Sequence, residues 1–337
     1  MKRNRCLNFF KGLACFGIVL AHERFPGNLG IIMWNLAHWI VLFFYMISGY
    51  YAYYPDKNKT LSKLPPKMKH ILKITLVSIL VYFIFLLFNH IIIERDAVEW
   101  LKSLISLKNL FDIVVLTNFE TTLKASHLWY LPSLIYCYLL LYYAIKCNKT
   151  KVLYYMVPIL IVLRILIPYM PGFNWNHQQN FLLGALPYFV IGYYYAAHKE
   201  KINKITDKLS NKQIIAIIIF SLLLRTCQTY IDVTADIFEI GAIVTAISIF
   251  AFAQKNPDFY ISNFFETVGT KYSLFIYVMH ILIAMIIKKI FEILLLDSYN
   301  WYPYVFPILV PIFTLISAII WDKIFIFIKK IKLQNCQ

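Results

Sequence analysis

The stretch that decides the fold class runs from Ile71 to Ile93 and reads ILKITLVSILVYFIFLLFNHIII. Lys73 is its only residue with a full charge. An apolar run of about 20 residues is long enough to cross the roughly 30 Å hydrocarbon core of a bilayer as a helix. Similar runs recur along the chain, so the sequence predicts a polytopic membrane protein.

The composition excludes the soluble classes of protein. Of the 337 residues, 60% are hydrophobic and 15% are charged, and the mean hydropathy is +0.64. Ordinary soluble domains are about 45–50% apolar and about 25% charged. The formal charge of +16 would suggest nucleic acid in a soluble chain. Because positive residues also collect in the cytoplasmic loops of membrane proteins, we expect no nucleic-acid partner.

We predict an all-α integral membrane protein with about ten transmembrane helices, in one domain over residues 1–337 with no added soluble domain. Lys and Arg number 24 on one side of these helices and five on the other. The positive-inside rule then predicts that both termini are cytoplasmic. The predicted spans are 8–22, 31–53, 71–93, 127–146, 152–169, 180–197, 213–230, 237–254, 272–296 and 302–328.

Three further features concern the connections and the helix ends. The outer segment 94–126 contains an amphipathic stretch, Trp100 to Leu116, which predicts a helix at the membrane surface. The segment between the second and third spans, which contains Lys57, is predicted to be a cytoplasmic loop. The prolines are predicted to shape kinks, which membrane helices tolerate; they are Pro132, Pro158 and Pro187.

The first span carries two ionisable residues, Lys11 and His22. At about 100° and about 1.5 Å per residue, they lie within about 20° of one helix face and about 16 Å apart along the axis. Ionisable groups inside membranes are costly and usually face a cavity or a protein partner. The pair suits an anionic carrier that enters from the cytoplasm and delivers its reactive end near the outer side. Two plainer interpretations stay open: a positive flank for Lys11 and an interfacial role for His22.

Several short motifs follow this helix in a fixed order. They are His22-Glu-Arg-Phe-Pro-Gly27, Phe43-Phe-Tyr-Met-Ile-Ser-Gly-Tyr50, His127-Leu-Trp-Tyr-Leu131, Asn180-Phe-Leu-Leu-Gly-Ala-Leu-Pro-Tyr-Phe189 and Ser273-Leu-Phe-Ile-Tyr-Val-Met-His280. With the basic residue and histidine of the first span, the ordered set resembles the acyltransferase 3 family. These membrane proteins transfer acyl groups, commonly acetyl, to cell-surface carbohydrates.

The chain departs from the family pattern at three basic positions. Lys11, His38 and Gln179 stand where the family often has arginine. Lysine offers phosphates a point charge, whereas arginine offers a planar fork. The differences therefore bear on carrier binding and acceptor preference.

The resemblance implies that His22 is the catalytic residue, either as a base or as the acyl carrier, because imidazole titrates near neutral pH. No metal is expected. Lys11 and Arg164 are the predicted residues for binding acetyl-CoA, the implied acyl donor; an alternative for Arg164 is an ion pair with Asp232 or Glu239. The predicted substrate-binding residues are Ser48, His127, Trp129, Tyr130 and Asn180.

Each of these substrate-binding residues also has a structural interpretation. Ser48-Gly49 can form a helix-packing notch, and Trp129 and Tyr130 can be anchors at the membrane interface. His127 can cap its helix. His280 is expected either to face a cavity or to bond a neighbour.

The resemblance implies transfer of acetyl from cytoplasmic acetyl-CoA to a hydroxyl of an extracytoplasmic glycan. A capsular or other exopolysaccharide is the expected acceptor, either as a surface glycan or as a lipid-linked glycan. The expected location is the cytoplasmic (inner) membrane of a bacterium, with membrane lipids as further partners. The alternative is a multi-pass glycan exporter or flippase without catalysis. Transporters often contain repeated halves, and no clear internal repeat is present in the sequence.

Overall fold

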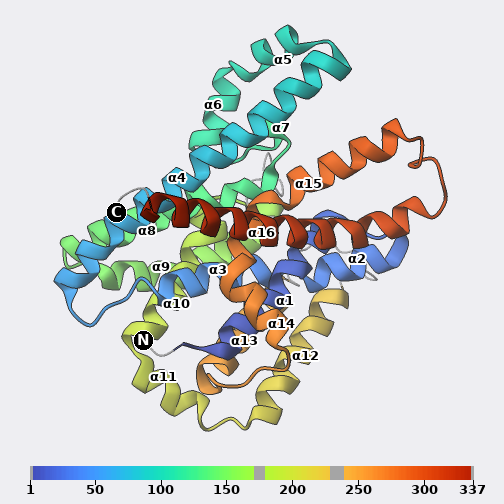
Figure 1. Cartoon of the computed structure of the whole chain (residues 1–337). Coiled ribbons are helices and arrows are strands. Elements are labelled where there is room, and N and C mark those ends of the chain that lie inside the picture. Colours follow the sequence, from blue (N-terminus) through green and yellow to red (C-terminus); the bar gives the residue numbers. More distant parts are fainter. Residues whose placement is uncertain (1–2, 171–178, 228–238, 335–337) are drawn as a thin grey trace. The chain divides into compact units, whose positions relative to one another are not determined.

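The computed structural model describes residues 3–170, 179–227 and 239–334, and every regular element within them is helical (Figure 1). The predicted all-α class is confirmed. The chain packs as two compact units. The first unit comprises Met1–Ala37 and Asn256–Gln337, and the second comprises His38–Lys255. Each unit is described by itself.

Five helical stretches of the described chain are long and apolar enough to cross a bilayer. A sixth would be counted if Lys199–Thr206 and Asn211–Cys227, which meet at 90°, formed one broken span. These helices indicate a multi-pass membrane protein. The arrangement of ten spans stays a prediction. The five stretches are Gly27–Tyr50, Lys57–Glu94, Ser126–Lys146, Asn263–Ile293 and Tyr302–Lys330.

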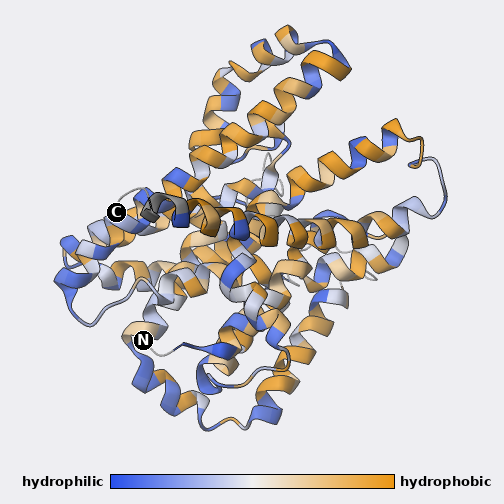
Figure 2. Cartoon of the chain, viewed as in Figure 1, coloured by the Kyte–Doolittle hydropathy of each residue, from blue (hydrophilic) through white to orange (hydrophobic). Residues whose placement is uncertain are grey.

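Helices also lie over the other predicted spans, but they are shorter. Each of α9 (Thr150–Leu166), α12 (Asn211–Cys227) and α13 (Glu239–Lys255) has 17 residues. At about 1.5 Å per residue such a helix is about 26 Å long, slightly less than the hydrocarbon core. Hydrophobic residues dominate the longer helices α4 (Lys57–Asn89) and α16 (Tyr302–Gln334) along most of their length (Figure 2).

Two predictions about the connections are corrected. The lysine-rich segment after the second span is not a loop, because α4 begins at Lys57 and runs through Pro65 and Pro66. The helix begins there because the Asp56 carboxylate accepts a hydrogen bond from the Asn58 N–H at 2.9 Å, an N-cap.

The predicted amphipathic helix in the outer segment is present as two pieces, α5 (Ala97–Leu104) and α6 (Leu107–Val114). The predicted helix is interrupted at Ser106. The Ser106 hydroxyl accepts a hydrogen bond from the Asn109 N–H at 3.1 Å and so caps the second piece.

Only one of the three prolines lies well inside a helix. Pro158 is within α9, whereas Pro132 and Pro187 lie in the first turns of α8 (Tyr130–Lys146) and α10 (Leu186–Ala197). A proline in the first turn removes an N–H that has no partner within the helix.

The first unit is built around α1 (Arg5–His22), which packs against α14 (Asn263–Thr267), η7 (Val268–Tyr272) and α15 (Ser273–Ile293). Two glycines allow the close crossing. A Cβ on Gly12 would lie 1.9 Å from the Phe265 carbonyl oxygen, and one on Gly269 would lie 1.9 Å from that of Asn8. The unit also contains α2 (Gly27–Leu36) and α16.

In the second unit, α3 (Trp39–Tyr50) and α10 cross through a reciprocal glycine notch. A Cβ on Gly49 would lie 1.9 Å from the Phe189 carbonyl oxygen, and one on Gly192 would lie 1.9 Å from that of Met46. The packing notch predicted at Ser48-Gly49 is therefore confirmed. The other elements are η1 (His90–Glu94), α7 (Glu120–Leu123), η2 (Ser126–Trp129), η3 (Ile167–Tyr169), η5 (Phe181–Ala185) and α11 (Lys199–Thr206).

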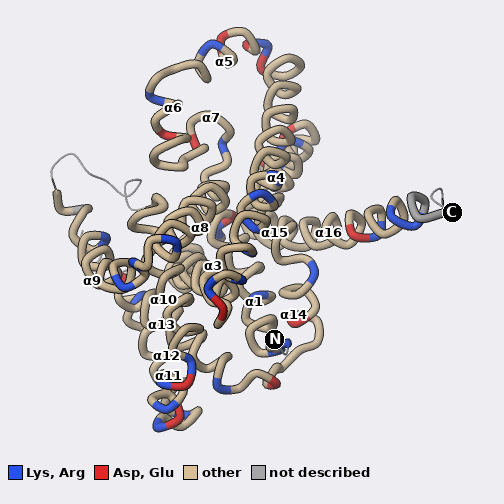
Figure 3. Tube along the Cα trace, turned by 90° about the vertical axis from the view of Figure 1, so that its left-hand side faces the viewer, with Lys and Arg blue, Asp and Glu red and all other residues tan. Residues whose placement is uncertain are grey.

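Charged residues are unevenly distributed along the helices (Figure 3). They gather in α11, in the connection that holds α5 and α6, and toward the C-terminal end of α16, while most of α8 and α10 carries none (Figure 3). Uncharged helix centres with charged ends are the arrangement that a bilayer requires.

Candidate functional site

Lys11 and His22 lie on one continuous helix, α1, so the axial spacing of about 16 Å predicted for them follows from helix geometry. His22 is the last helical residue and is exposed, and Lys11 is half-buried. Within the described parts of the chain, Lys11 makes no ion pair with a carboxylate. Its ammonium group is therefore not neutralised by a neighbouring acid of those parts.

The histidine at the end of α1 faces a second histidine. The rings of His22 and His280 have centroids 5.2 Å apart and planes inclined by 50°. His280 is fully buried on α15. Its Nδ1 lies 3.0 Å from the Ile276 carbonyl oxygen and 2.8 Å from that of Tyr277.

These two contacts fix the tautomer of the neutral His280 ring. A carbonyl oxygen can only accept a hydrogen bond, so Nδ1 must carry the proton. The lone pair is then on Nε2. The prediction that His280 bonds a neighbour is confirmed, and the ring is held by its own helix in one orientation beside His22.

Glu23 adds a third titratable group at this end of α1. Burial raises the pKa of the Glu23 carboxyl from an ordinary 4.5 to about 7, and the charge of Lys288 on α15 acts in the opposite direction. Glu23 is the C-cap of α1, and its backbone N–H donates the last helical hydrogen bond, to the Val19 carbonyl at 2.9 Å. The carboxyl of Glu23 therefore changes charge near neutral pH, one residue from His22.

In the second unit, three of the predicted substrate-binding residues lie together around Tyr45 of α3. The Ser48 and Tyr130 hydroxyls are 3.2 Å apart, and the Tyr45 hydroxyl donates to the Tyr130 carbonyl at 3.3 Å. The Tyr45 ring lies 4.5 Å from the Tyr130 ring and 5.8 Å from the Trp129 ring, measured between centroids. Ser48, Trp129 and Tyr130 thus form one aromatic and hydroxyl cluster.

The other two predicted substrate-binding residues make separate contacts. His127 is buried on η2, with Nε2 3.3 Å from the Tyr82 hydroxyl. The Asn180 side chain accepts hydrogen bonds from the N–H groups of Leu182 and Leu183, at 2.8 and 3.0 Å. Asn180 is thus the N-cap of η5. This capping role explains why an asparagine stands at this position, and no ligand is needed to explain it.

Arg164 is part of a buried ionic cluster. Its Nε and Nη2 donate to Glu239 Oε1 at 3.1 and 2.9 Å, and Arg225 Nη1 lies 4.0 Å from Glu239 Oε2. The Tyr188 ring lies 5.9 Å from the Arg164 guanidinium. The ion pair with Glu239 that the sequence offered as an alternative is present; Asp232, the other partner considered, lies outside the described residues.

One histidine and two carboxylates meet where α4 ends. His90 Nδ1 lies 3.0 Å from Glu94 Oε2 and 2.6 Å from Asp96 Oδ1, and its ring stacks on Trp100 at 4.7 Å. Arg95, between the two acids, has a left-handed backbone with φ of 58°. The imidazole thus closes the tight turn that leads into α5.

The predicted site residues are therefore divided between the two units. The first holds Lys11 and His22, and the second holds Arg164 and the five predicted substrate-binding residues. His280, whose ring faces that of His22, was not among the predicted site residues, although the motif Ser273 to His280 ends with it.

A comparison with protein-family models identifies the family of the chain. The model of an acyltransferase domain, acyltransferase 3, matches residues 4–322, nearly the whole chain. The chain belongs to the acyltransferase 3 family. It is accordingly a membrane acyltransferase, and the resemblance found in the sequence motifs is confirmed. Comparisons with curated proteins and with solved structures find no match.

Proposed function

We propose that this acyltransferase moves an acetyl group from cytoplasmic acetyl-CoA to a hydroxyl of an extracytoplasmic glycan. The observation that carries the proposal is the pair of histidine rings, His22 and His280, at one end of α1, with Lys11 about 16 Å away toward the other end. We take the acceptor to be a capsular or other exopolysaccharide, and the location to be the bacterial cytoplasmic membrane.

The orientation of α1 in this proposal comes from the loop charges. The excess of Lys and Arg on the side of the termini favours a cytoplasmic start of α1. Lys11 would then meet the anionic phosphates of the donor as a point charge. His22 would lie toward the outer face, where a glycan is available.

In the proposed reaction, His22 takes the proton from the acceptor hydroxyl as its oxygen attacks the thioester carbonyl. A C–O bond forms and the C–S bond breaks. The proton on His22 then passes to the departing thiolate, which leaves as the CoA thiol. In the alternative route with an acyl carrier, a ring nitrogen of His22 attacks the thioester, the C–S bond breaks and the thiolate leaves with the proton of the ring as the CoA thiol. The acceptor hydroxyl then attacks the acyl-imidazole, the C–N bond breaks and the hydroxyl proton returns to the His22 ring.

His280 acts through His22 in either route. Its Nδ1 is committed to two backbone carbonyls, so the neutral ring keeps an acceptor on Nε2, and the ring lies 5.2 Å from that of His22. Such an acceptor favours one tautomer of His22 and steadies the imidazolium that forms when His22 takes a proton. We assign His280 as a positioning residue.

The cluster of Ser48, Trp129 and Tyr130 supports a role in binding the acceptor. Aromatic faces and hydroxyls are the groups that pack against and hydrogen-bond a sugar ring. Lys11 and Arg164 are proposed to bind the donor, with the difference that Arg164 already has Glu239 as an ionic partner. Its contribution to donor binding would therefore be weaker than that of Lys11.

The test combines cells and purified protein. The O-acetyl content of surface polysaccharide is measured in cells with the intact gene, a deletion, His22→Ala and the control His70→Ala, an exposed histidine of α4. Acetyl-CoA turnover by each purified protein is measured in parallel. His22→Ala should lower turnover by about 10²–10⁴-fold, the usual contribution of a general base, while His70→Ala should not.

Membrane levels of all variants are compared by immunoblot. Loss of acetyl groups in the deletion and in His22→Ala, with normal insertion, would support the proposal. Unchanged acetylation combined with polymer that no longer reaches the surface would overturn it in favour of glycan export.

A further inference from the structure

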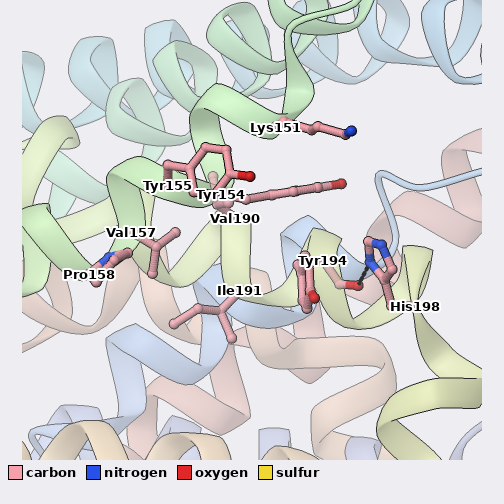
Figure 4. A pocket seen from close by; sticks show the side chains of 9 residues that line it. All are labelled: Lys151, Tyr154, Tyr155, Val157, Pro158, Val190, Ile191, Tyr194 and His198. Atoms are coloured by element: carbon pink, nitrogen blue, oxygen red, sulfur yellow. Dashed lines mark hydrogen bonds between the residues drawn. The ribbon is translucent and has the colours of Figure 1, made fainter.

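A cavity of about 450 Å³ lies between α9 and α10 in the second unit (Figure 4). It is distinct from the Tyr45 cluster and from the Arg164–Glu239 pair, because none of those residues lines it. Its volume is within the range of about 300–1,000 Å³ that is usual for ligand pockets.

The cavity has an apolar part and a polar part. Val157, Pro158 and Ile191 form an apolar wall, and Lys151 and His198 lie at the other end (Figure 4). Lys151 belongs to the first turn of α9, and His198 follows the last residue of α10. A ligand that fills this space must itself be apolar at one end and polar or anionic at the other.

The polar end is held in place by ring contacts. The Tyr194 and His198 rings are stacked with centroids 4.2 Å apart, and His198 Nδ1 lies 3.1 Å from the Tyr194 carbonyl oxygen. The Tyr154 ring meets the Tyr194 ring edge-on at 4.8 Å. Because His198 Nδ1 faces a carbonyl, it donates, and the neutral ring keeps its lone pair on Nε2.

The cavity opens on the exposed apolar surface of α9, which is suited to contact with lipid chains. Exposed apolar side chains recur every three or four residues along this helix and form one stripe. Tyr155 belongs to this stripe with 73% of its surface exposed, and it also lines the cavity. The other members of the stripe are Val152, Ile159, Val162 and Leu166.

The charges around the polar end are mostly positive, although the acid Glu200 stands between two of the lysines. Lys146 and Lys149 precede Lys151 in the connection before α9, and Lys199 and Lys201 follow His198 in α11. Both connections are on the predicted cytoplasmic side. The cytoplasmic leaflet carries the anionic lipids, and basic pockets between transmembrane helices on that side bind anionic headgroups.

We propose that this cavity binds an anionic phospholipid of the cytoplasmic leaflet. The phosphate would be held by Lys151, and His198 Nε2 would accept a hydrogen bond from a headgroup hydroxyl, with an acyl chain against Val157, Pro158 and Ile191. The inference rests on the predicted orientation of the helices and not on the acyl-transfer reaction. A soluble glycan would use the three tyrosines of the cavity but would leave the apolar wall of Val157, Pro158 and Ile191 without a matching group, so a lipid fits better.

The test is native mass spectrometry of the full chain released from membranes with phosphatidylglycerol or phosphatidylcholine as the probe. The wild type should retain phosphatidylglycerol in preference to phosphatidylcholine. Lys151→Gln should lower the retained phosphatidylglycerol about fivefold, as expected for one lysine near a headgroup. Lys149→Gln is the matched control, because Lys149 is exposed, lies two residues away and does not line the cavity.

A second variant tests the apolar wall without changing the charge. Ile191→Trp should fill the cavity and lower phosphatidylglycerol retention while the thermal unfolding of the protein stays near that of the wild type. Equal retention of the two lipids, or an equal loss in Lys149→Gln, would overturn the proposal. Displacement of the lipid by acetyl-CoA would also overturn it, since the cavity would then be a nucleotide site. No acyl acceptor is present in these measurements, so their outcome is independent of the proposed reaction.

Discussion

The imidazole of His280 is held by its own helix through two carbonyl contacts, and its ring lies 5.2 Å from that of His22. The buried ring thus has a fixed orientation, whereas its neighbour is exposed at the end of α1. In the proposed reaction, the buried His280 ring would orient the accessible imidazole of His22.

We expect His280→Ala to lower acetyl-CoA turnover by about 10–100-fold, as is typical when a partner that orients a functional histidine is lost. The pH dependence of turnover should shift as well, because His22 loses the neighbour that influences its protonation. His280→Gln, which can still accept a hydrogen bond, should restore part of the rate. Steady-state turnover from pH 5 to 9 is the measurement. A loss of rate with an unchanged pH profile and no recovery in His280→Gln would indicate a purely structural role.

Glu23→Gln should abolish a titration near pH 7. The folded pKa of Glu23 is raised to about 7 from an ordinary 4.5. The unfolded chain therefore releases this proton at lower pH than the folded one, and folding stability falls as pH rises between these two values. The melting temperature of the wild type should thus fall relative to that of Glu23→Gln between pH 4.5 and 7. Parallel melting curves for the two proteins across that range would contradict this prediction.

The fold class could be predicted from the sequence because apolar runs and loop charges are local properties, visible in short segments of the chain. The sequence predicted a helix ending at His22 and a packing notch at Gly49 for the same reason. It did not predict that the lysine-rich segment at Lys57 is helical, because the six lysines of this segment suggested a loop. There, the Asp56 cap and the favourable helix start outweigh the two prolines at 65 and 66.

Only some of the contacts among the predicted site residues could be predicted from the sequence, for a physical reason. Helical spacing relates Lys11 to His22 within one helix, but it carries no information about which residue a distant helix brings alongside. The approach of His280 to His22 follows from the packing of α1 against α15, and two glycines allow the close crossing of α1 with the preceding elements α14 and η7. Arg164 illustrates the same limit, since two candidate acids were equally plausible until the fold brought Glu239 to 2.9 Å.

Gly49→Ala should destabilise the second unit more than Gly241→Ala does. A Cβ on Gly49 would lie 1.9 Å from the Phe189 carbonyl oxygen, whereas on Gly241 the closest atom, the Ser221 carbonyl oxygen, is 2.6 Å away. Overpacking of this kind usually costs about 1–3 kcal/mol, and backbone atoms cannot turn aside as a side chain can. Melting temperatures of the two purified variants in one detergent give the comparison. Equal melting temperatures would mean that the helices separate freely at the notch.

Glu239→Gln should be strongly destabilising and should change the apparent affinity for acetyl-CoA only weakly, because Arg164 is the weaker of the two proposed donor contacts. The substitution keeps the shape of the side chain but leaves Arg164 and Arg225 without the carboxylate that they face in the buried cluster. Removing one partner of a buried ion pair typically costs about 3–5 kcal/mol. The matched variant Glu200→Gln, in the charged helix α11, removes an acid from the same unit without touching the cluster. Unfolding midpoints and the KM for acetyl-CoA are measured for both. If Glu239→Gln left the midpoint unchanged and altered the KM instead, Arg164 would serve the donor directly, and its pairing with Glu239 would be secondary.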